Sequence, residues 1–170
     1  RGESLVNVDA LTNLSNLIEL YVDYYNFPVS PNQINFLPKN GEMTTRKQVE
    51  EYQDKIRLVM ALRDGDTDVL KDYRKSTNLD LSGCDSLQNV DGLANCTKLT
   101  VLNLEESKSL KNVDGLVNCT NLTSLELRWC NSLQNLDGLA NCTKITSLDL
   151  SGCNSLQNLD GLANCNNLTN

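Results

Sequence analysis

The chain has 170 residues, of which 39% are hydrophobic and only 5% aromatic, so its core must be built mainly from aliphatic side chains. Its formal net charge of −7 argues against nucleic acid or an anionic membrane as the main partner. No apolar run approaches the length of about 18 residues that a membrane-spanning helix needs, so we expect no membrane insertion.

The first part of the chain, residues 1–22, reads as a partial repeat unit. Residues 4–22 align with residues 86–104, and leucine or valine fills the same positions in both segments. We therefore expect the second half of one repeat here, followed by a strand near Leu20 that starts the next repeat. This strand should pair in parallel with the later ones.

Residues 23–75 interrupt the repeats with a different composition. All three prolines fall within residues 26–42, which favours irregular chain with turns. A capping box of Thr45 and Gln48 then begins a segment with apolar residues at helical spacing. The pattern predicts a long helix over residues 45–63, with Val49, Ile56, Val59 and Met60 on its buried side.

Gly65 is placed to end this helix, and a shorter helix is expected over Thr67–Lys75. Two interpretations of the whole insert remain open. In the first, the insert is a helical cap that covers the end or flank of the repeat stack, because such stacks need their apolar ends covered. Alternatively, it is an insertion that forms part of a binding site.

From Ser76 onward the chain repeats every 23 residues, with leading leucines at Leu79, Leu102, Leu125 and Leu148. Each Leu-x-Leu segment predicts a short parallel strand with both leucines facing inward. An Asp-Gly pair follows in every repeat, beginning with Asp91 and Gly92. We expect the aspartate to cap a helical turn on the outer side and the glycine to permit the sharp turn into it.

Seven cysteines follow the same period in two tracks. The first track is Cys96, Cys119, Cys142 and Cys165, and the second is Cys84, Cys130 and Cys153, with Ser107 in the missing position. Repetition at a core position favours reduced, buried thiols over disulfides or a metal site. Buried thiols suit a reducing compartment, so we expect an intracellular, cytoplasmic protein, with a secreted or cell-surface location as the alternative.

This unit, L-x-x-L-x-L-x-x-C-x-x-L-x-x-[LV]-x-G-L-x-x-C-x-x, resembles the leucine-rich repeat family. It is similar to the cysteine-containing repeats of bacterial proteins and plant immune receptors. The resemblance implies an α/β solenoid with a parallel β-sheet on its concave face. It also implies a binding module. Cysteine or serine stands where the family commonly has asparagine after the strand, so the family's continuous asparagine ladder is not expected.

The chain has no histidine, no phosphate-binding loop and no dinucleotide-binding motif, which removes the common catalytic arrangements, and we expect no cofactor or metal. We predict a non-catalytic protein–protein recognition module that is part of a larger protein. The alternative is the substrate-recognition segment of an enzyme whose catalytic domain lies outside this chain.

The predicted binding face consists of outward-facing residues around the strands. Residues 76–170 carry ten acidic and five basic residues, so the partner should be a protein or peptide with a basic patch. Trp129 is the only tryptophan, and it is read either as a binding hot spot or as packing that leans over the Cys130 track. We predict partner contacts at Asp80, Val101, Asn103, Glu105, Glu106, Ser124, Glu126, Arg128, Trp129 and Asp149.

Overall fold

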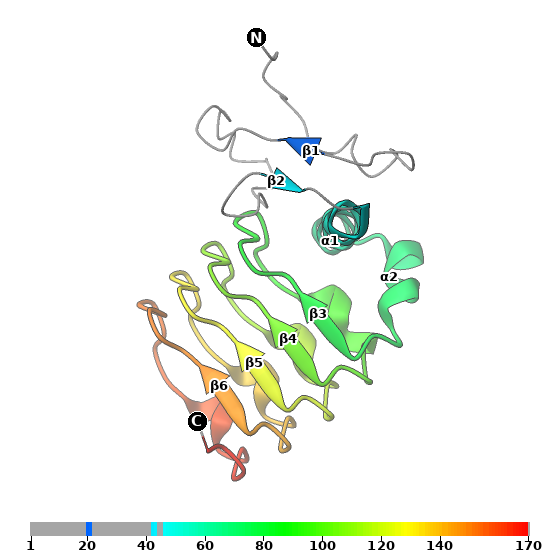
Figure 1. Ribbon diagram of the computed structural model, residues 1–170. Coiled ribbons are helices and arrows are strands. Elements are labelled where there is room, and N and C mark those ends of the chain that lie inside the picture. Colours follow the sequence, from blue (N-terminus) through cyan, green and yellow to red (C-terminus); the bar gives the residue numbers. More distant parts are fainter. Residues whose placement is uncertain (1–19, 22–41, 44–45, 170) are drawn as a thin grey trace.

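The computed structural model describes residues 20–21, 42–43 and 46–169 (Figure 1). The strands are β1 (Leu20–Tyr21), β2 (Glu42–Met43), β3 (Asn78–Asp80), β4 (Val101–Asn103), β5 (Ser124–Glu126) and β6 (Ser147–Asp149). The helices are α1 (Arg46–Asp64) and α2 (Thr67–Tyr73), and short 3-10 helices follow the later strands: η3 (Asp91–Asn95), η4 (Asp114–Leu116), η5 (Asp137–Leu139) and η6 (Asp160–Leu162).

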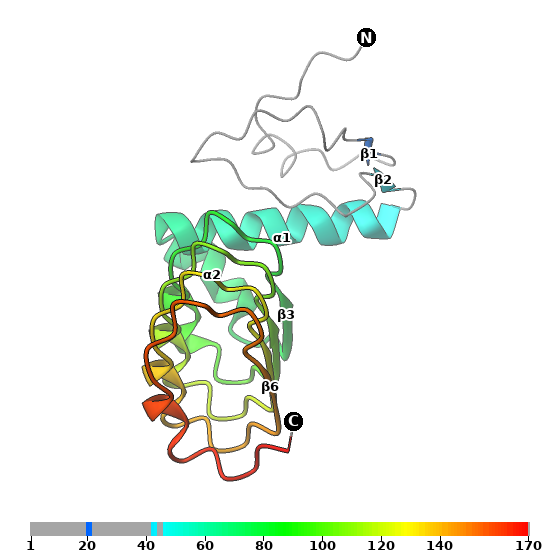
Figure 2. The ribbon, with the colours of Figure 1, turned by 90° about the vertical axis from the view of Figure 1, so that its left-hand side faces the viewer.

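Strands β3 to β6 form one parallel sheet in sequence order, with one strand per 23-residue repeat. The leading leucines pair in register, from Leu79 to Leu102 to Leu125 to Leu148, which confirms the predicted strands at these four positions. We call the stretches 78–100, 101–123, 124–146 and 147–169 coils 1 to 4. The sheet lines one side of the coil stack and the 3-10 helices line the other (Figure 2).

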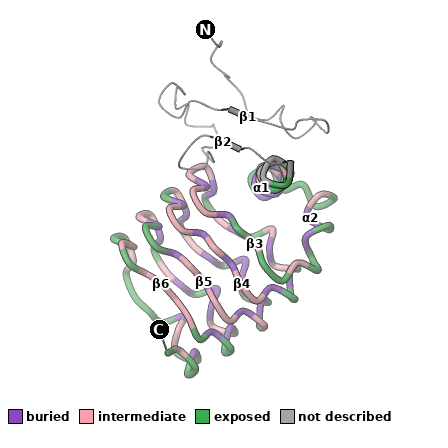
Figure 3. Tube along the Cα trace, in the orientation of Figure 1, coloured by how far each residue is buried: buried purple, intermediate pink, exposed green. Residues whose placement is uncertain are grey.

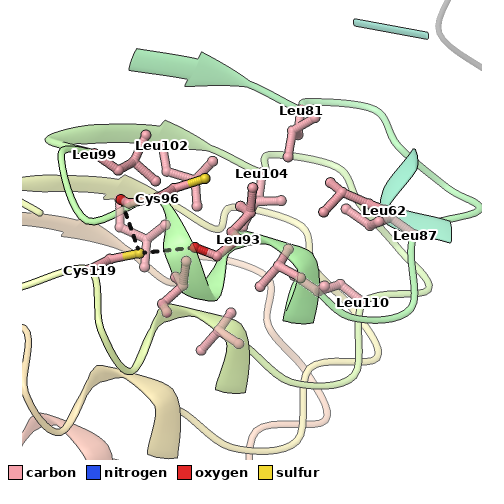
Figure 4. Packing of buried hydrophobic residues seen from close by; sticks show 14 of the residues in the cluster. Leu62, Leu81, Leu87, Leu93, Cys96, Leu99, Leu102, Leu104, Leu110 and Cys119 are labelled. Carbon is pink, nitrogen blue, oxygen red and sulfur yellow. Dashed lines mark hydrogen bonds between the residues drawn. The ribbon is translucent and has the colours of Figure 1, made fainter. Parts of the chain in front are cut away.

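The leucines of the coils point into a single interior. Leu102, Leu104, Leu125 and Leu127 are fully buried in the two central coils, as the alternation of the strand predicts. Figure 3 shows buried stretches recurring along the coils, and Figure 4 shows Leu102 and Leu104 in this core. Leu148 of β6 and Leu150 after it are only partly buried, because no coil among the described residues stacks on coil 4. The chain therefore buries most apolar surface in its middle coils.

The predicted parallel strand near Leu20 is wrong. Leu20 instead pairs antiparallel with Met43, and Tyr21 with Glu42, in a separate two-stranded sheet. Helix α1 lies between this small sheet and β3 in both views (Figures 1 and 2). Because α1 lies across that end of the coil stack, β1 does not join β3, and it pairs instead with a segment much closer to it in sequence.

The role expected of the recurring aspartate in each repeat is also wrong, since its side chain caps no helix. The backbone N–H of Asp91 donates to Oδ1 of Asn89 at 3.1 Å, and Asp114, Asp137 and Asp160 bond in the same way to the asparagine two residues earlier. This asparagine accepts the free N–H at the start of the 3-10 helix, so the aspartate side chain is left exposed.

Side-chain donors connect each coil to the carbonyl groups of the coil before it. A threonine ladder runs along one side, where the hydroxyl of Thr123 donates to the carbonyl oxygen of Thr100 at 2.9 Å, and the same bond occurs at Thr100, Thr146 and Thr169. In the second cysteine track, Ser107 Oγ donates to Leu81 O at 3.1 Å and Cys130 Sγ to Leu104 O at 3.2 Å. Serine replaces cysteine once in this track, at Ser107, where it supplies the same small donor.

Helices α1 and α2 confirm the predicted long and short helices, although α2 ends two residues earlier than expected. Gly65 ends α1 with φ of +69°, and the Asp66 carboxylate caps α2 by accepting the N–H groups of Asp68 and Val69. The side chain of Tyr73 joins the helices through a 2.7 Å hydrogen bond to Asp54. Thr45 and the side chains of Gln48 and Val49 lie outside what the structure describes, so the predicted capping box stays a prediction.

The helices share one hydrophobic core with the coils. Ile56, Val59 and Leu70 belong to the same buried cluster as the leucines of coils 1 to 3, and Met60 packs against it. Figure 4 shows Leu62 of α1 beside Leu87 of coil 1. No helix in the described part of the chain is long and apolar enough to cross a membrane.

Candidate partner-binding face

The ten predicted site residues lie on the sheet side of the coil stack, and none of them is buried. They occupy rows of equivalent positions that cross the coils. The first row is Asn78, Val101, Ser124 and Ser147, and the second is Asp80, Asn103, Glu126 and Asp149. The third and fourth rows follow the strands: Ser82, Glu105, Arg128 and Ser151, then Gly83, Glu106, Trp129 and Gly152. We call these four rows the strand face.

Three residues of the second row serve the backbone of their own coil. Oδ1 of Asp80, Asn103 and Asp149 each accepts the N–H group two residues later, at 2.9, 2.9 and 2.7 Å. These bonds turn the chain where the strand ends. The hydrogen bond from Ser151 lowers the pKa of Asp149, with Arg128 adding to the shift, so this carboxylate stays charged. Alternation in the sequence placed these residues outward but did not indicate their local role.

The fourth row is the place where the two central coils differ from the outer ones. All four residues have a left-handed backbone, with φ of +69° at Gly83, +59° at Glu106, +63° at Trp129 and +77° at Gly152. Glycine adopts this conformation without steric cost, whereas other residues lose roughly 1 kcal/mol or more there. Glu106 and Trp129 are the only non-glycine residues with positive φ in the described ranges.

Trp129 is 48% exposed, and its ring rests on the next coil. A Cβ atom added to Gly152 would stand 2.5 Å from Cε3 of the indole. The ring therefore leans over Gly152, 23 residues away in the next coil. Gly152 is a part of the site that sequence reasoning missed, and the only available signal was glycine in the neighbouring repeat at the tryptophan position.

The structure brings Arg128 and Glu105 together across β5 and β4. Arg128 Nε donates to Glu105 Oε1 at 2.8 Å, and a second guanidinium nitrogen contacts the same oxygen. This carboxylate raises the pKa of Arg128, so the arginine is fully charged and already paired. The carboxylates of Glu106 and Glu126 make no hydrogen bond or ion pair within the described residues. The strand face is thus acidic, with its one arginine committed internally.

Helix α1 reaches the strand face through Lys55, a second contribution that sequence reasoning missed. Its Nζ atom donates to Ser82 Oγ at 3.1 Å and lies 3.4 Å from Asp80 Oδ1. Asp80 is therefore paired with the insert, and it is not grouped with the unpaired acids around Trp129. The pattern of residues 45–63 predicted which helix positions face the core, but it carried no sign of this contact.

The thiols are placed for packing rather than for chemistry. All seven cysteines are free in the structure, and six of them are buried. Burial raises the pKa of Cys119 and Cys130 to about 12, which keeps these thiols protonated and poorly nucleophilic. No group of three or more histidine, cysteine, aspartate or glutamate residues within the described ranges could hold a metal ion.

Comparison with known families identifies the repeat. Residues 120–164, which span parts of coils 2 to 4, match the family described as Leucine Rich repeats (2 copies). This match supports the leucine-rich repeat family for these repeats. Leucine-rich repeat domains generally mediate protein–protein interaction and are typically non-enzymatic binding modules. No curated protein matches the chain.

Proposed function

We propose that this leucine-rich repeat protein is a non-catalytic recognition module of a larger protein, and that it binds a protein or peptide with a basic patch through its strand face. The observation that carries the proposal is the position of the Trp129 side chain. A large aromatic side chain lies half-exposed in the middle of this face, at a backbone position where the outer coils have glycine. Tryptophan and arginine are the side chains most enriched among binding hot spots.

The position of Trp129 is costly for a residue that serves packing alone. Glycine at this turn would avoid the left-handed strain, as it does at Gly83. The ring covers Gly152, yet about half of its surface stays open to solvent. A contact with a partner would bury this open part, and that burial offsets the strain only in the complex.

The charge of the face supports a basic partner. The repeats carry twice as many acidic as basic residues, and the charge of Arg128 is already paired with the Glu105 carboxylate. An approaching basic patch would therefore meet the unpaired carboxylates of Glu106 and Glu126, and such complementarity speeds association and sets the orientation of the partner. The association should weaken as salt rises from about 50 to about 500 mM, because ions screen exposed charges.

The experiment is a comparison of partner capture by four forms of the chain: wild type, Trp129→Ala, Trp129→Gly and Val117→Ala. Trp129→Gly recreates the turn of the outer coils, so it removes the ring without adding strain. Val117→Ala is the matched control, because Val117 is an exposed apolar residue, 39% accessible, that directly follows η4 on the opposite side.

We expect both Trp129 variants to weaken partner binding by about 2 kcal/mol or more while thermal stability stays nearly unchanged. Val117→Ala should bind like wild type. If Trp129→Gly lowers the melting temperature and leaves affinity intact, the ring is packing and the proposed face is misplaced.

We also propose that the protein works in a reducing compartment inside the cell. The support is the burial of the cysteine tracks, in which six of the seven thiols are placed as donors to a backbone carbonyl rather than beside a bonded sulfur. Titration of the denatured, unreduced protein purified from its source should find about seven free thiols. A smaller number would point to disulfides and to the secreted alternative.

A further inference from the structure

We propose that Trp129 and Glu106 form a subsite for one arginine side chain of the partner, whose guanidinium stacks on the open part of the indole and pairs with the Glu106 carboxylate. This inference rests on the proposed function, because it assigns a chemical identity to the central contact of the strand face. It commits to a polypeptide ligand that presents an arginine, not to a free ion.

The two side chains leave equivalent positions on neighbouring coils. The backbone N–H of Glu106 donates to the carbonyl oxygen of Arg128 at 2.7 Å, which holds Glu106 beside the residue that precedes Trp129. Adjacent strands lie about 4.8 Å apart, so two residues in the same row are immediate neighbours. A cation can interact with an indole face at up to about 6 Å from the ring centre. The indole leans toward Gly152 on the next coil, so the guanidinium would stack on the open part of the ring and reach back to the Glu106 side chain on the coil before it.

No cation in the described part of the chain is recorded in contact with Glu106. Arg128, which follows the strand in the same coil as Trp129, is held by Glu105 on the neighbouring coil. Lys55 is bound to Asp80 and Ser82 on coil 1, at the helical end of the face. The Glu106 carboxylate makes no hydrogen bond or ion pair in the part of the chain that the structure describes.

The subsite favours arginine over other ligands on chemical grounds. An anionic ligand would be repelled by the acidic repeats, which have ten acidic residues against five basic ones. A second copy of the chain would present the same excess of acid. A guanidinium is planar, stacks on aromatic rings and keeps its charge at every physiological pH, whereas the ammonium group of lysine is compact and more strongly hydrated.

The test uses a labelled nona-arginine peptide, with nona-lysine and a neutral glycine-serine peptide of equal length as comparisons. Binding is measured by fluorescence anisotropy at low salt, and the emission of Trp129, the only tryptophan, reports the contact directly. We expect the arginine peptide to bind about fivefold more tightly than the lysine peptide and to change the Trp129 emission saturably. The neutral peptide should do neither.

The decisive variants are Glu106→Gln and Glu126→Gln. Both remove one unpaired carboxylate from the strand face, so they change the net charge equally. We expect Glu106→Gln to weaken the affinity for the arginine peptide about tenfold and to reduce the difference in affinity between the arginine and lysine peptides. Glu126→Gln should have a much smaller effect on both. Equal weakening by the two variants, or equal affinity for arginine and lysine, would mean diffuse attraction and would overturn the subsite.

Failure of the subsite is distinguishable from failure of the proposed face. If Trp129→Gly weakens capture of the natural partner while Glu106→Gln leaves both capture and the arginine preference intact, the face stands and the arginine subsite falls. If Trp129→Gly leaves capture unchanged, the proposed face itself is wrong.

Discussion

Gly115 lies against the backbone of Val90 on the preceding coil, so closely that a Cβ atom on Gly115 would overlap the Val90 carbonyl oxygen. The same atom would stand 2.7 Å from the Cα of Asp91. Gly138 and Gly161 meet the coil before them in the same way. In three of the four Asp-Gly pairs of the repeats the glycine therefore sets how closely two coils pack, which is a different role from the turn geometry expected from the sequence.

Replacing Gly138 by alanine should destabilise the protein strongly, because backbone atoms of the preceding coil cannot rotate away from the added methyl group. We expect a loss of about 3 kcal/mol in the free energy of unfolding. Gly92→Ala is the matched control, since its methyl group would meet only the side-chain ends of Leu62 and Leu70, at 2.7 and 2.8 Å, and should cost much less. Urea unfolding measures both, and equal losses would contradict this account.

Equivalent leucines in coils 3 and 4 should differ in their contribution to stability. Leu136 is fully buried, whereas Leu159, one repeat later, is 55% exposed. We expect Leu136→Ala to lower the free energy of unfolding by about 3 kcal/mol and Leu159→Ala to lower it by less than about 1 kcal/mol, because only the first substitution leaves a cavity. The two variants are compared by urea unfolding. Similar costs would indicate that coil 4 is covered in solution.

The left-handed turn at Glu106 predicts an unusual response to glycine. Glu106→Gly should leave the free energy of unfolding unchanged or raise it by up to about 1 kcal/mol, since it relieves backbone strain. Glu126→Gly, in the regular strand β5, should instead lower it by about 1 kcal/mol. Thermal and urea unfolding check the pair. A clear loss at Glu106 would mean that its side chain stabilises the free protein.

Alkaline pH should destabilise the fold through the buried thiols. Burial raises the pKa of Cys130 from its ordinary value of 9.0 to about 12. Above about pH 9 the unfolded chain releases this proton while the folded chain retains it, so the free energy of unfolding falls as pH rises toward 12. Below pH 9 this thiol contributes no pH dependence.

Cys130→Ser tests the assignment, because serine occupies the same track at position 107 and bonds a carbonyl there. Between about pH 8 and about pH 10.5 the variant should lose about 1 kcal/mol less stability than wild type. Urea midpoints at the two pH values supply the measurement. Identical pH dependence would show that the Cys130 thiol does not govern the alkaline loss.

Helix α1 is expected to act as a cap for the coil stack. Ile56 is fully buried in the cluster that α1 shares with the coils, so Ile56→Asp should expose apolar surface and cause self-association, as should deletion of residues 43–75. Lys47→Ala is the control, because Lys47 is exposed and pairs only with Glu51. Light scattering separates the outcomes. A monomeric Ile56→Asp protein of unchanged stability would argue against a cap.

The repeat architecture could be predicted from the sequence because its determinants are local. The leucines recur every 23 residues, and alternation along each strand decides which neighbours face inward and which face outward. The same reasoning located the long helix, since the spacing of Ile56 and Val59 depends only on the geometry of one helix. The outward placement of Trp129 and the acidic character of its face follow from these periods alone.

Only the tertiary structure decided the contacts between coils and between the insert and the repeats. Leu20 matched the repeat pattern, yet α1 lies across the end of the stack and the strand pairs with Met43 instead. Gly152 receives the Trp129 ring, and Lys55 reaches Ser82, through distances that no single repeat specifies. Such contacts depend on how closely coils stack and where the insert lies, and these are properties of packing between segments that a linear period does not encode.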